Sequence, residues 1–308
     1  VYQYVSRKQG ENVLFERVPY KHWRLEADFP ELEFRWISEA STRLAGLLTG
    51  ETHITQLPED QMAEAANAGM VIAQGTIDAQ RVFIGFKGVY QDDESACGYK
   101  YCDSPFMDLK VRKAMNKALN RTELNEAFFG GKGRPMYMNH LSPTGSYNNP
   151  DWEKNFPAEY GYDPAAAKAL LAEAGYNAAN PLKIGVEVTV LLQFTQSGDV
   201  MESAAAYWNE IGIQTDLLTI DAATLRAQTR ELAYSEQVIF HGTPDFDMQG
   251  WRVRNSKLTP RGTGIELRET DEVLSRVRGS MVTETQNALL RELGDLAYPL
   301  HTSMFLFW

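Results

Sequence analysis

The chain has 308 residues, a length typical of about two domains, and 44% of them are hydrophobic while 23% are charged. This composition excludes an intrinsically disordered chain, which would lack the apolar surface to offset the entropy of ordering, and no stretch approaches the roughly 18 consecutive apolar residues of a membrane-spanning helix. The net charge of −11, from 30 Lys and Arg against 41 Asp and Glu, argues against nucleic acid as a partner, because a phosphate backbone is bound by clustered cations.

Strand signals open the chain. Residues 1–8 and 13–18 alternate in hydrophobicity on either side of a Gln-Gly-Glu-Asn turn, which predicts a β-hairpin, and residues 31–37 predict a third strand. Apolar residues at helical spacing then predict a helix over about 40–50, ended by a glycine, and a shorter one over about 58–69.

The central region is mainly helical. Strand-like pieces within 71–86 precede Asp108, which can cap a helix, and Asn120 opens another with a capping box. Residues 131–152 are rich in Gly, Pro, Asn and Ser and predict a long loop, a kind of segment that is often functional. Asp163, followed by proline, is a typical helix start.

A strand–helix–strand unit follows over residues 183–220. Residues 184–190 alternate as a strand, 198–211 form a helical pattern, and 213–220 form a second strand. Two such strands joined by one helix are parallel, so this part predicts an α/β fold.

The two cysteines, Cys97 and Cys102, leave two interpretations open. A small disulfide loop would suit an exported protein, whereas two unpaired thiols would leave the compartment undetermined.

The sequence lacks the motifs of the common catalytic and metal sites. The Gly-Gly-Lys-Gly segment 130–133 follows a helix and lacks the spacing of a dinucleotide-binding loop. The five histidines have no metal-ligand spacing, and acidic pairs such as Asp92-Asp93 are interpreted as solvated loops rather than as glycosidase carboxylates. We therefore expect no catalytic residue, metal or cofactor.

Aromatic residues in loop-like segments are better candidates for function. Tyr137, Tyr147, Trp152 and Trp251 fall outside the periodic segments. Large rings with few rotatable bonds can form the walls of a ligand cleft, although such rings can also fill the joints between elements.

Five sequence blocks occur in the order found in one family. They are Pro-Tyr-Lys-His-Trp at 19–23, Phe-Arg-Trp-Ile at 34–37 with Ser-Thr-Arg-Leu-Ala-Gly-Leu-Leu-Thr-Gly-Glu at 41–51, Pro-Phe-Met-Asp-Leu-Lys-Val-Arg-Lys-Ala at 105–114, Tyr-Asp-Pro at 162–164 with Ala-Leu-Leu-Ala-Glu-Ala-Gly-Tyr at 169–176, and Trp-Asn-Glu-Ile-Gly-Ile at 208–213. Together they resemble the extracellular solute-binding proteins of the peptide/nickel class, family 5, which serve ABC importers. Lys87 stands where the family usually has Asn.

The resemblance implies a fold of the periplasmic-binding-protein type II, with two α/β lobes that close around a ligand. It assigns residues 1–84 to part of lobe I, 85–285 to the second lobe, and 286–308 to a segment that returns to lobe I. It also implies that an N-terminal portion is missing from this chain, so one lobe would be incomplete and the chain alone would bind its solute weakly.

The same resemblance implies the ligand-binding residues. Trp251 follows a segment, 246–250, that is similar to the family's strand leading into the cleft, and Arg252 and Arg254 are candidate clamps for a carboxylate. Three further residues, Arg134, Tyr137 and Lys87, lie in segments that are close to the cleft in the family.

The expected function is that of a binding protein, not an enzyme, which captures a peptide or peptide-like small solute and delivers it to a membrane permease. Its expected location is the periplasm or the cell surface. The alternatives are a ligand sensor or chaperone on the same scaffold, or a hydrolase with an acidic pair.

Overall fold

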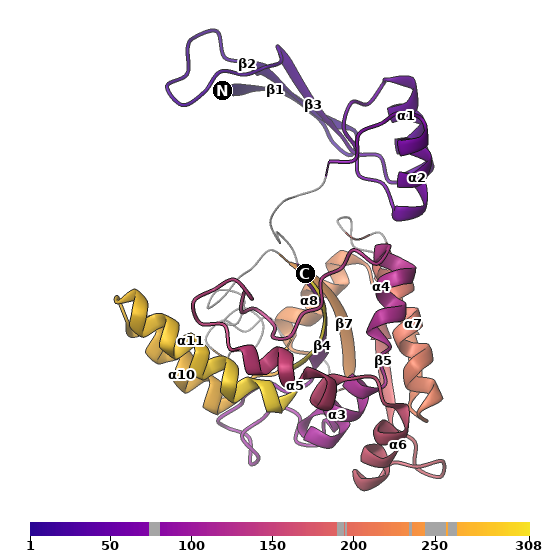
Figure 1. Ribbon diagram of the computed structural model, residues 1–308, viewed down its shortest axis with the longest axis vertical. Coiled ribbons are helices and arrows are strands. Elements are labelled where there is room, and N and C mark those ends of the chain that lie inside the picture. The colour runs from indigo at the N-terminus through magenta and orange to yellow at the C-terminus, as the bar shows by residue number, and fades with distance from the viewer. Residues whose placement is uncertain (74–80, 190–193, 195, 234–235, 244–256, 258–263) are drawn as a thin grey trace. The chain divides into compact units, whose positions relative to one another are not determined.

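The structure is a computed structural model, and it describes residues 1–73, 81–189, 194, 196–233, 236–243, 257 and 264–308. The chain divides into two compact units, Val1–Gln74 and Gly75–Trp308 (Figure 1). Within the described residues, no helix combines the length and the apolar character that crossing a bilayer requires.

The first unit consists of a three-stranded antiparallel sheet and two helices. The strands, in the order β1-β2-β3, are β1 (Tyr2–Lys8), β2 (Asn12–Arg17) and β3 (Glu31–Arg35), which confirms the predicted hairpin and third strand. The helices are α1 (Ala40–Thr49) and α2 (Glu59–Asn67). Gly50 ends α1 at a φ of 76°, a left-handed conformation that glycine adopts without steric cost.

The second unit is built on a five-stranded sheet in the order β6-β5-β7-β4-β8. Its strands are β4 (Arg81–Lys87), β5 (Lys183–Glu187), β6 (Gln214–Leu218), β7 (Gln237–Thr243) and β8 (Ser303–Phe307). β5 is parallel to β6 and to β7, whereas β4 is antiparallel to β7 and to β8. The predicted strand–helix–strand unit is therefore confirmed.

Helices connect and cover these strands. They are α3 (Leu109–Lys117), α4 (Arg121–Phe129), α5 (Pro150–Tyr160), α6 (Pro164–Glu173), α7 (Ser197–Glu210), α8 (Ala222–Glu231), α10 (Arg268–Gly279) and α11 (Thr283–Ala297), with short 3₁₀ turns η1 (Pro105–Met107) and η2 (Tyr298–Leu300). The predicted caps are confirmed, because the side chains of Asp108, Asn120 and Asp163 each accept a hydrogen bond from a first-turn backbone N–H.

The predicted loop over residues 131–152 is shorter than expected. α5 begins at Pro150, and Asn149 caps it by accepting a hydrogen bond from the N–H of Asp151 at 3.0 Å. An Asx residue followed by proline is the same start signal that correctly predicted α6, and the surrounding loop-like composition concealed it.

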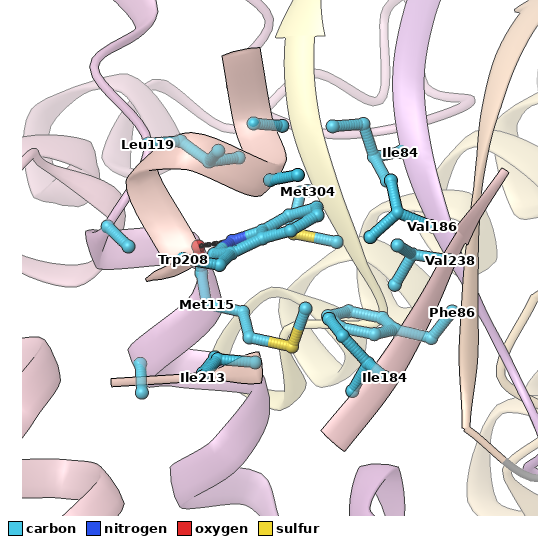
Figure 2. Packing of buried hydrophobic residues seen from close by; sticks show 14 of the residues in the cluster. Ile84, Phe86, Met115, Leu119, Ile184, Val186, Trp208, Ile213, Val238 and Met304 are labelled. Atoms are coloured by element: carbon cyan, nitrogen blue, oxygen red, sulfur yellow. Dashed lines mark hydrogen bonds between the residues drawn. The ribbon is translucent and has the colours of Figure 1, made fainter. Parts of the chain in front are cut away.

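The main core lies on one face of the five-stranded sheet. Val82, Ile84 and Phe86 of β4 pack there with residues of α3, α6 and α7. Figure 2 shows Trp208 at the centre of this cluster, where its indole N–H donates to the carbonyl of Met115 at 3.1 Å. A second cluster joins α5, α10 and α11 to Phe305 of β8.

The two compact units have other bounds than the sequence-based division, which refers to the lobes of a whole binding protein. The observed boundary follows Gln74, ten residues before the expected one. Residues 286–308 belong to the second unit, where β8 is hydrogen-bonded to β4 and α11 packs against α10. The assignment of the units to the lobes of a whole binding protein stays a prediction.

Cys97 and Cys102 form a disulfide with their Cα atoms 5.9 Å apart. Of the two interpretations left open by the sequence, the structure therefore supports the small disulfide loop.

Candidate ligand-binding site

The carboxyl edge of the parallel strands is the place to expect a ligand in an open α/β sheet. β5, β6 and β7 all run toward this edge, and β7 extends to Thr243, four residues beyond Ile239, which pairs with the last residue of β5. Because β4 is antiparallel, its first residue, Arg81, lies opposite Thr243. β8 runs in the same direction as β7 and brings Phe307 and then Trp308 to this edge, where Phe307 pairs with Val82.

The loop after α4 extends the sheet at the carboxyl edge. The N–H of Arg134 donates to the carbonyl of Trp308 at 3.3 Å, and the N–H of Trp308 donates to the carbonyl of Arg134 at 2.8 Å. The N–H of Met136 donates to the carbonyl of Leu306 at 3.1 Å. These bonds fix Arg134 next to the end of β8. The sequence-predicted residue therefore lies at the edge that the topology favours.

Asn125 holds the start of this loop. Its side-chain amide donates to the carbonyl of Gly133 at 2.8 Å and accepts from the N–H of Gly133 at 2.9 Å. A Cβ atom on Gly133 would lie 2.7 Å from Oδ1 of Asn125 and 2.8 Å from Cγ of Phe307. Only glycine therefore fits between α4 and β8, immediately before Arg134.

A cavity of about 250 Å³ opens beside this loop. Both Arg134 and Tyr137 line it, as do the rings of Trp152 and Trp308 and the carboxyl group of Glu153. The remaining lining residues are Pro135, Met138, Leu141, Pro143, Asn148 and Asn149. The cavity thus combines one cation, one anion, three aromatic rings and two side-chain amides, a mixture suited to a small solute with polar and apolar parts.

The chemistry of the cavity depends on the state of Tyr137. The hydroxyl of Tyr137 is protonated near neutral pH, as in an ordinary tyrosine, and can donate a hydrogen bond; burial, and after it the charge of Glu153, raise its pKa further. The ring of Phe156 contacts it edge-on at 5.2 Å between centroids, which fixes the orientation of the tyrosine.

Trp308 has a cation on its face. The guanidinium carbon of Arg81 lies 5.6 Å from the ring centroid, and Arg81 is fully buried. A cation over an indole is favourable and stiffens both groups, so this wall of the cavity is well defined.

Lys87 does not line this cavity, and its part in ligand binding stays a prediction. It lies at the far end of β4 from Arg81, six residues and roughly 20 Å along the strand. Its side chain is fully buried in an ion pair with Glu187 of β5. The family position that suggested a ligand contact is occupied here by an internal charge pair.

The other predicted residues divide into two groups. Trp251, Arg252, Arg254 and the segment 246–250 lie outside the described residues. Tyr147 and Trp152 are buried, and Trp152 lies in α5 with its indole N–H donating to Asp295 at 2.9 Å.

Sequence reasoning missed Trp308, Glu153 and the two amides, Asn148 and Asn149. The sequence-based prediction for residues 286–308 concerned their place in the lobes and gave no sign that the last residue forms a wall of the cavity. In the part of the chain that the structure describes, no cluster of three or more His, Cys, Asp or Glu side chains is arranged to hold a metal ion.

Comparison with known proteins identifies the family. The chain belongs to the bacterial extracellular solute-binding proteins, family 5, because the sequence model for the middle portion of that family matches residues 1–257.

Three relatives are similar to the chain over part of their length. The chain is 27% identical over 211 residues to heme-binding protein A of Haemophilus influenzae, which covers 68% of this chain and 35% of that protein. It is 24% identical over 209 residues to the dipeptide-binding protein of Escherichia coli, and the match covers 67% of this chain and 36% of that protein. A putative ABC transporter peptide-binding protein of Brucella ovis is 23% identical over 284 residues, and the match covers 89% of this chain and 47% of that protein. The chain therefore spans between a third and a half of the length of these relatives.

Solved structures show the same fold. The ABC transporter substrate-binding protein CtaP of Listeria monocytogenes superposes with a TM-score of 0.76 at 15% identity, over 100% of this chain and 59% of that one. OppA of Haemophilus influenzae, in complex with the peptide RPPGFSPFR, superposes with a TM-score of 0.69 at 18% identity. The superposition covers 99% of this chain and 58% of that one. The periplasmic-binding-protein fold predicted from the sequence is thus confirmed.

Proposed function

We propose that this chain is part of the solute-binding component of an ABC importer, and that it captures a peptide or peptide-like small solute for delivery to a membrane permease. Membership of family 5 supports the role in import. Relatives named as dipeptide- and peptide-binding proteins support the solute class. The single observation that carries the proposal is the cavity at the carboxyl edge, lined by Arg134, Tyr137 and Trp308.

Each lining group has a part in this function. The guanidinium of Arg134 can bind a carboxylate through two parallel hydrogen bonds. The rings of Trp152 and Trp308 offer apolar faces, while the side-chain amide of Asn148 can pair with peptide groups. Capture and release require no bond to be made or broken, so the proposed role is binding without catalysis. The proposed location is the periplasm or the cell surface, in line with the extracellular character of the family.

The test compares two single-charge variants. Arg134→Ala removes a cation from the cavity, whereas Lys154→Ala removes one from the exposed face of α5, outside the cavity. Tryptophan fluorescence is titrated with a panel of peptides of two to nine residues, each with a free and an amidated C-terminus, up to millimolar concentration.

A hydrogen bond to a charged group contributes about 1.5–3 kcal/mol, so Arg134→Ala should weaken binding of the free peptides roughly tenfold to a hundredfold. Amidated peptides should lose little, and Lys154→Ala should change neither series. Equal affinities for both variants would refute the assignment of Arg134, and turnover of any peptide in the panel would refute a purely binding role.

A further inference from the structure

The loop that joins β4 to η1, residues 88–104, contains the disulfide between the two cysteines of the chain, Cys97 and Cys102. Within the loop, the N–H of Asp92 donates to the carbonyl of Gly98 at 3.0 Å. Cys97 and Cys102 are both exposed. The ring of six residues that they close therefore lies on the surface, where a thiol reagent can reach both sulfur atoms.

This ring caps the C-terminal end of α8. Nζ of Lys100 donates to the carbonyl of Glu231 at 2.6 Å, and the hydroxyl of Tyr101 donates to the carbonyl of Leu232 at 2.7 Å. The last carbonyls of a helix have no partner within the helix and carry its negative end, so a cation and a hydroxyl are suitable partners for them. Both donors lie between the two cysteines.

The same loop also contacts the N-terminal end of α10. Arg268, the first residue of α10, donates to the carbonyl of Gly98 at 3.1 Å and forms an ion pair with Asp93 at 2.8 Å. The N–H of Gln91 donates to Glu266 at 2.9 Å. Gly98 lies inside the ring, so one ring of six residues contacts two helices that are separated by more than thirty residues of sequence.

We infer that the Cys97–Cys102 pair is a thiol-exchange site, and that its disulfide form fastens the C-terminal end of α8 to the N-terminal end of α10. In the exchange, a thiolate of an external dithiol attacks one of the two sulfur atoms and breaks the bond between them. The second thiol of the reagent then resolves the mixed disulfide. The reagent leaves as a disulfide, and Cys97 and Cys102 each gain one electron and one proton.

Opening the ring weakens both contacts for one reason. A closed ring restricts the backbone between the cysteines, so the donors of Lys100 and Tyr101 are already oriented toward α8. In the reduced loop the same hydrogen bonds must also order a flexible segment. The end of α8 then frays, while the core stays packed, because its buried residues lie outside the ring and only the partly buried Tyr99 of the ring packs against it.

The test follows backbone amide exchange in the oxidised chain and after treatment with dithiothreitol. The reporter amides are those of Ala233, bonded to Gln228 at the end of α8, and of Glu266, bonded to Val89 before α10. We expect two free thiols per chain and exchange at least tenfold faster at both reporters, with the amides of β4 and β7 still protected. The variant Cys97→Ser/Cys102→Ser should behave like the reduced chain.

A matched variant separates the two contacts. Lys100→Met keeps the disulfide and removes one bond to α8, so it should accelerate exchange at Ala233 and leave Glu266 unchanged. If the serine variant does not fold, dithiothreitol treatment of the folded wild-type chain still tests the inference. The inference is wrong if no thiol appears until denaturant unfolds the chain, or if both thiols appear and exchange at the two reporters stays the same.

Discussion

The buried pair of Lys87 and Glu187 should be strongly coupled in stability. Both side chains are fully buried, on β4 and β5, with β7 between the two strands. Burial lowers the pKa of Lys87 and raises that of Glu187, while the attraction between them opposes both shifts. Replacing one partner leaves a buried charge without its counter-charge, which costs about 3–5 kcal/mol, whereas replacing both by apolar residues is often neutral or stabilising.

We therefore expect Lys87→Met and Glu187→Leu each to destabilise the second unit by about 3–5 kcal/mol, and the double variant to recover most of the loss. For a unit of this size the single losses correspond to melting temperatures lowered by roughly 6–20 °C. Urea unfolding, followed by circular dichroism and fluorescence, gives the four free energies of the double-mutant cycle.

A double variant as unstable as the sum of the two single variants would contradict the coupling. The same variants test the predicted part of Lys87 in ligand binding, because a charge that contacts no solute has no effect on affinity. Loss of peptide binding in a folded double variant would show that Lys87 takes part in ligand binding.

Three further predictions concern single residues. Burial lowers the pKa of His301 to about 2, so below pH 6.5 the unfolded state takes up a proton that the folded state does not. The free energy of unfolding then falls by about 1.4 kcal/mol for each pH unit. His301→Asn should remove this slope from the pH dependence of stability, and an unchanged slope would contradict the prediction. Asp163→Ala removes the cap of α6 and should lower the free energy of unfolding by about 1 kcal/mol without changing peptide affinity, which urea unfolding and titration check together. Gly133→Ala should cost about 1–3 kcal/mol and weaken peptide binding, because its methyl group overlaps Asn125 and Phe307; wild-type stability and affinity would contradict the close packing described here.

Local chemistry explains which elements the sequence predicts well. Asp163 with its following proline, and Asn120 with Glu123, are start signals whose hydrogen bonds involve neighbouring residues only. Asn149 with Pro150 is the same kind of signal, and it was overlooked because glycines and prolines surround it.

Long-range pairing explains what the sequence could not predict. The partner of Lys87 is 100 residues away, so alternation along β4 gives no sign of an ion pair. Trp308 becomes a wall of the cavity only because the loop of Arg134 pairs with the end of β8. Arg134 and Tyr137 were found through the family resemblance, and the residues around them follow from the pairing of the strands.

The most direct test of the cavity is the indole N–H signal of each of the six tryptophans in a ¹⁵N-labelled chain, assigned by Trp→Phe variants and followed by NMR as a peptide is added. Weak binding is sufficient, because shifts are measured at millimolar peptide. Trp152 and Trp308 line the cavity, whereas Trp208 lies in the main core. We predict that Trp152 and Trp308 shift with a common dissociation constant while Trp208 stays in place. Saturable shifts at Trp23 or Trp36 of the first unit, with Trp152 and Trp308 unmoved, would contradict a binding site at the carboxyl edge.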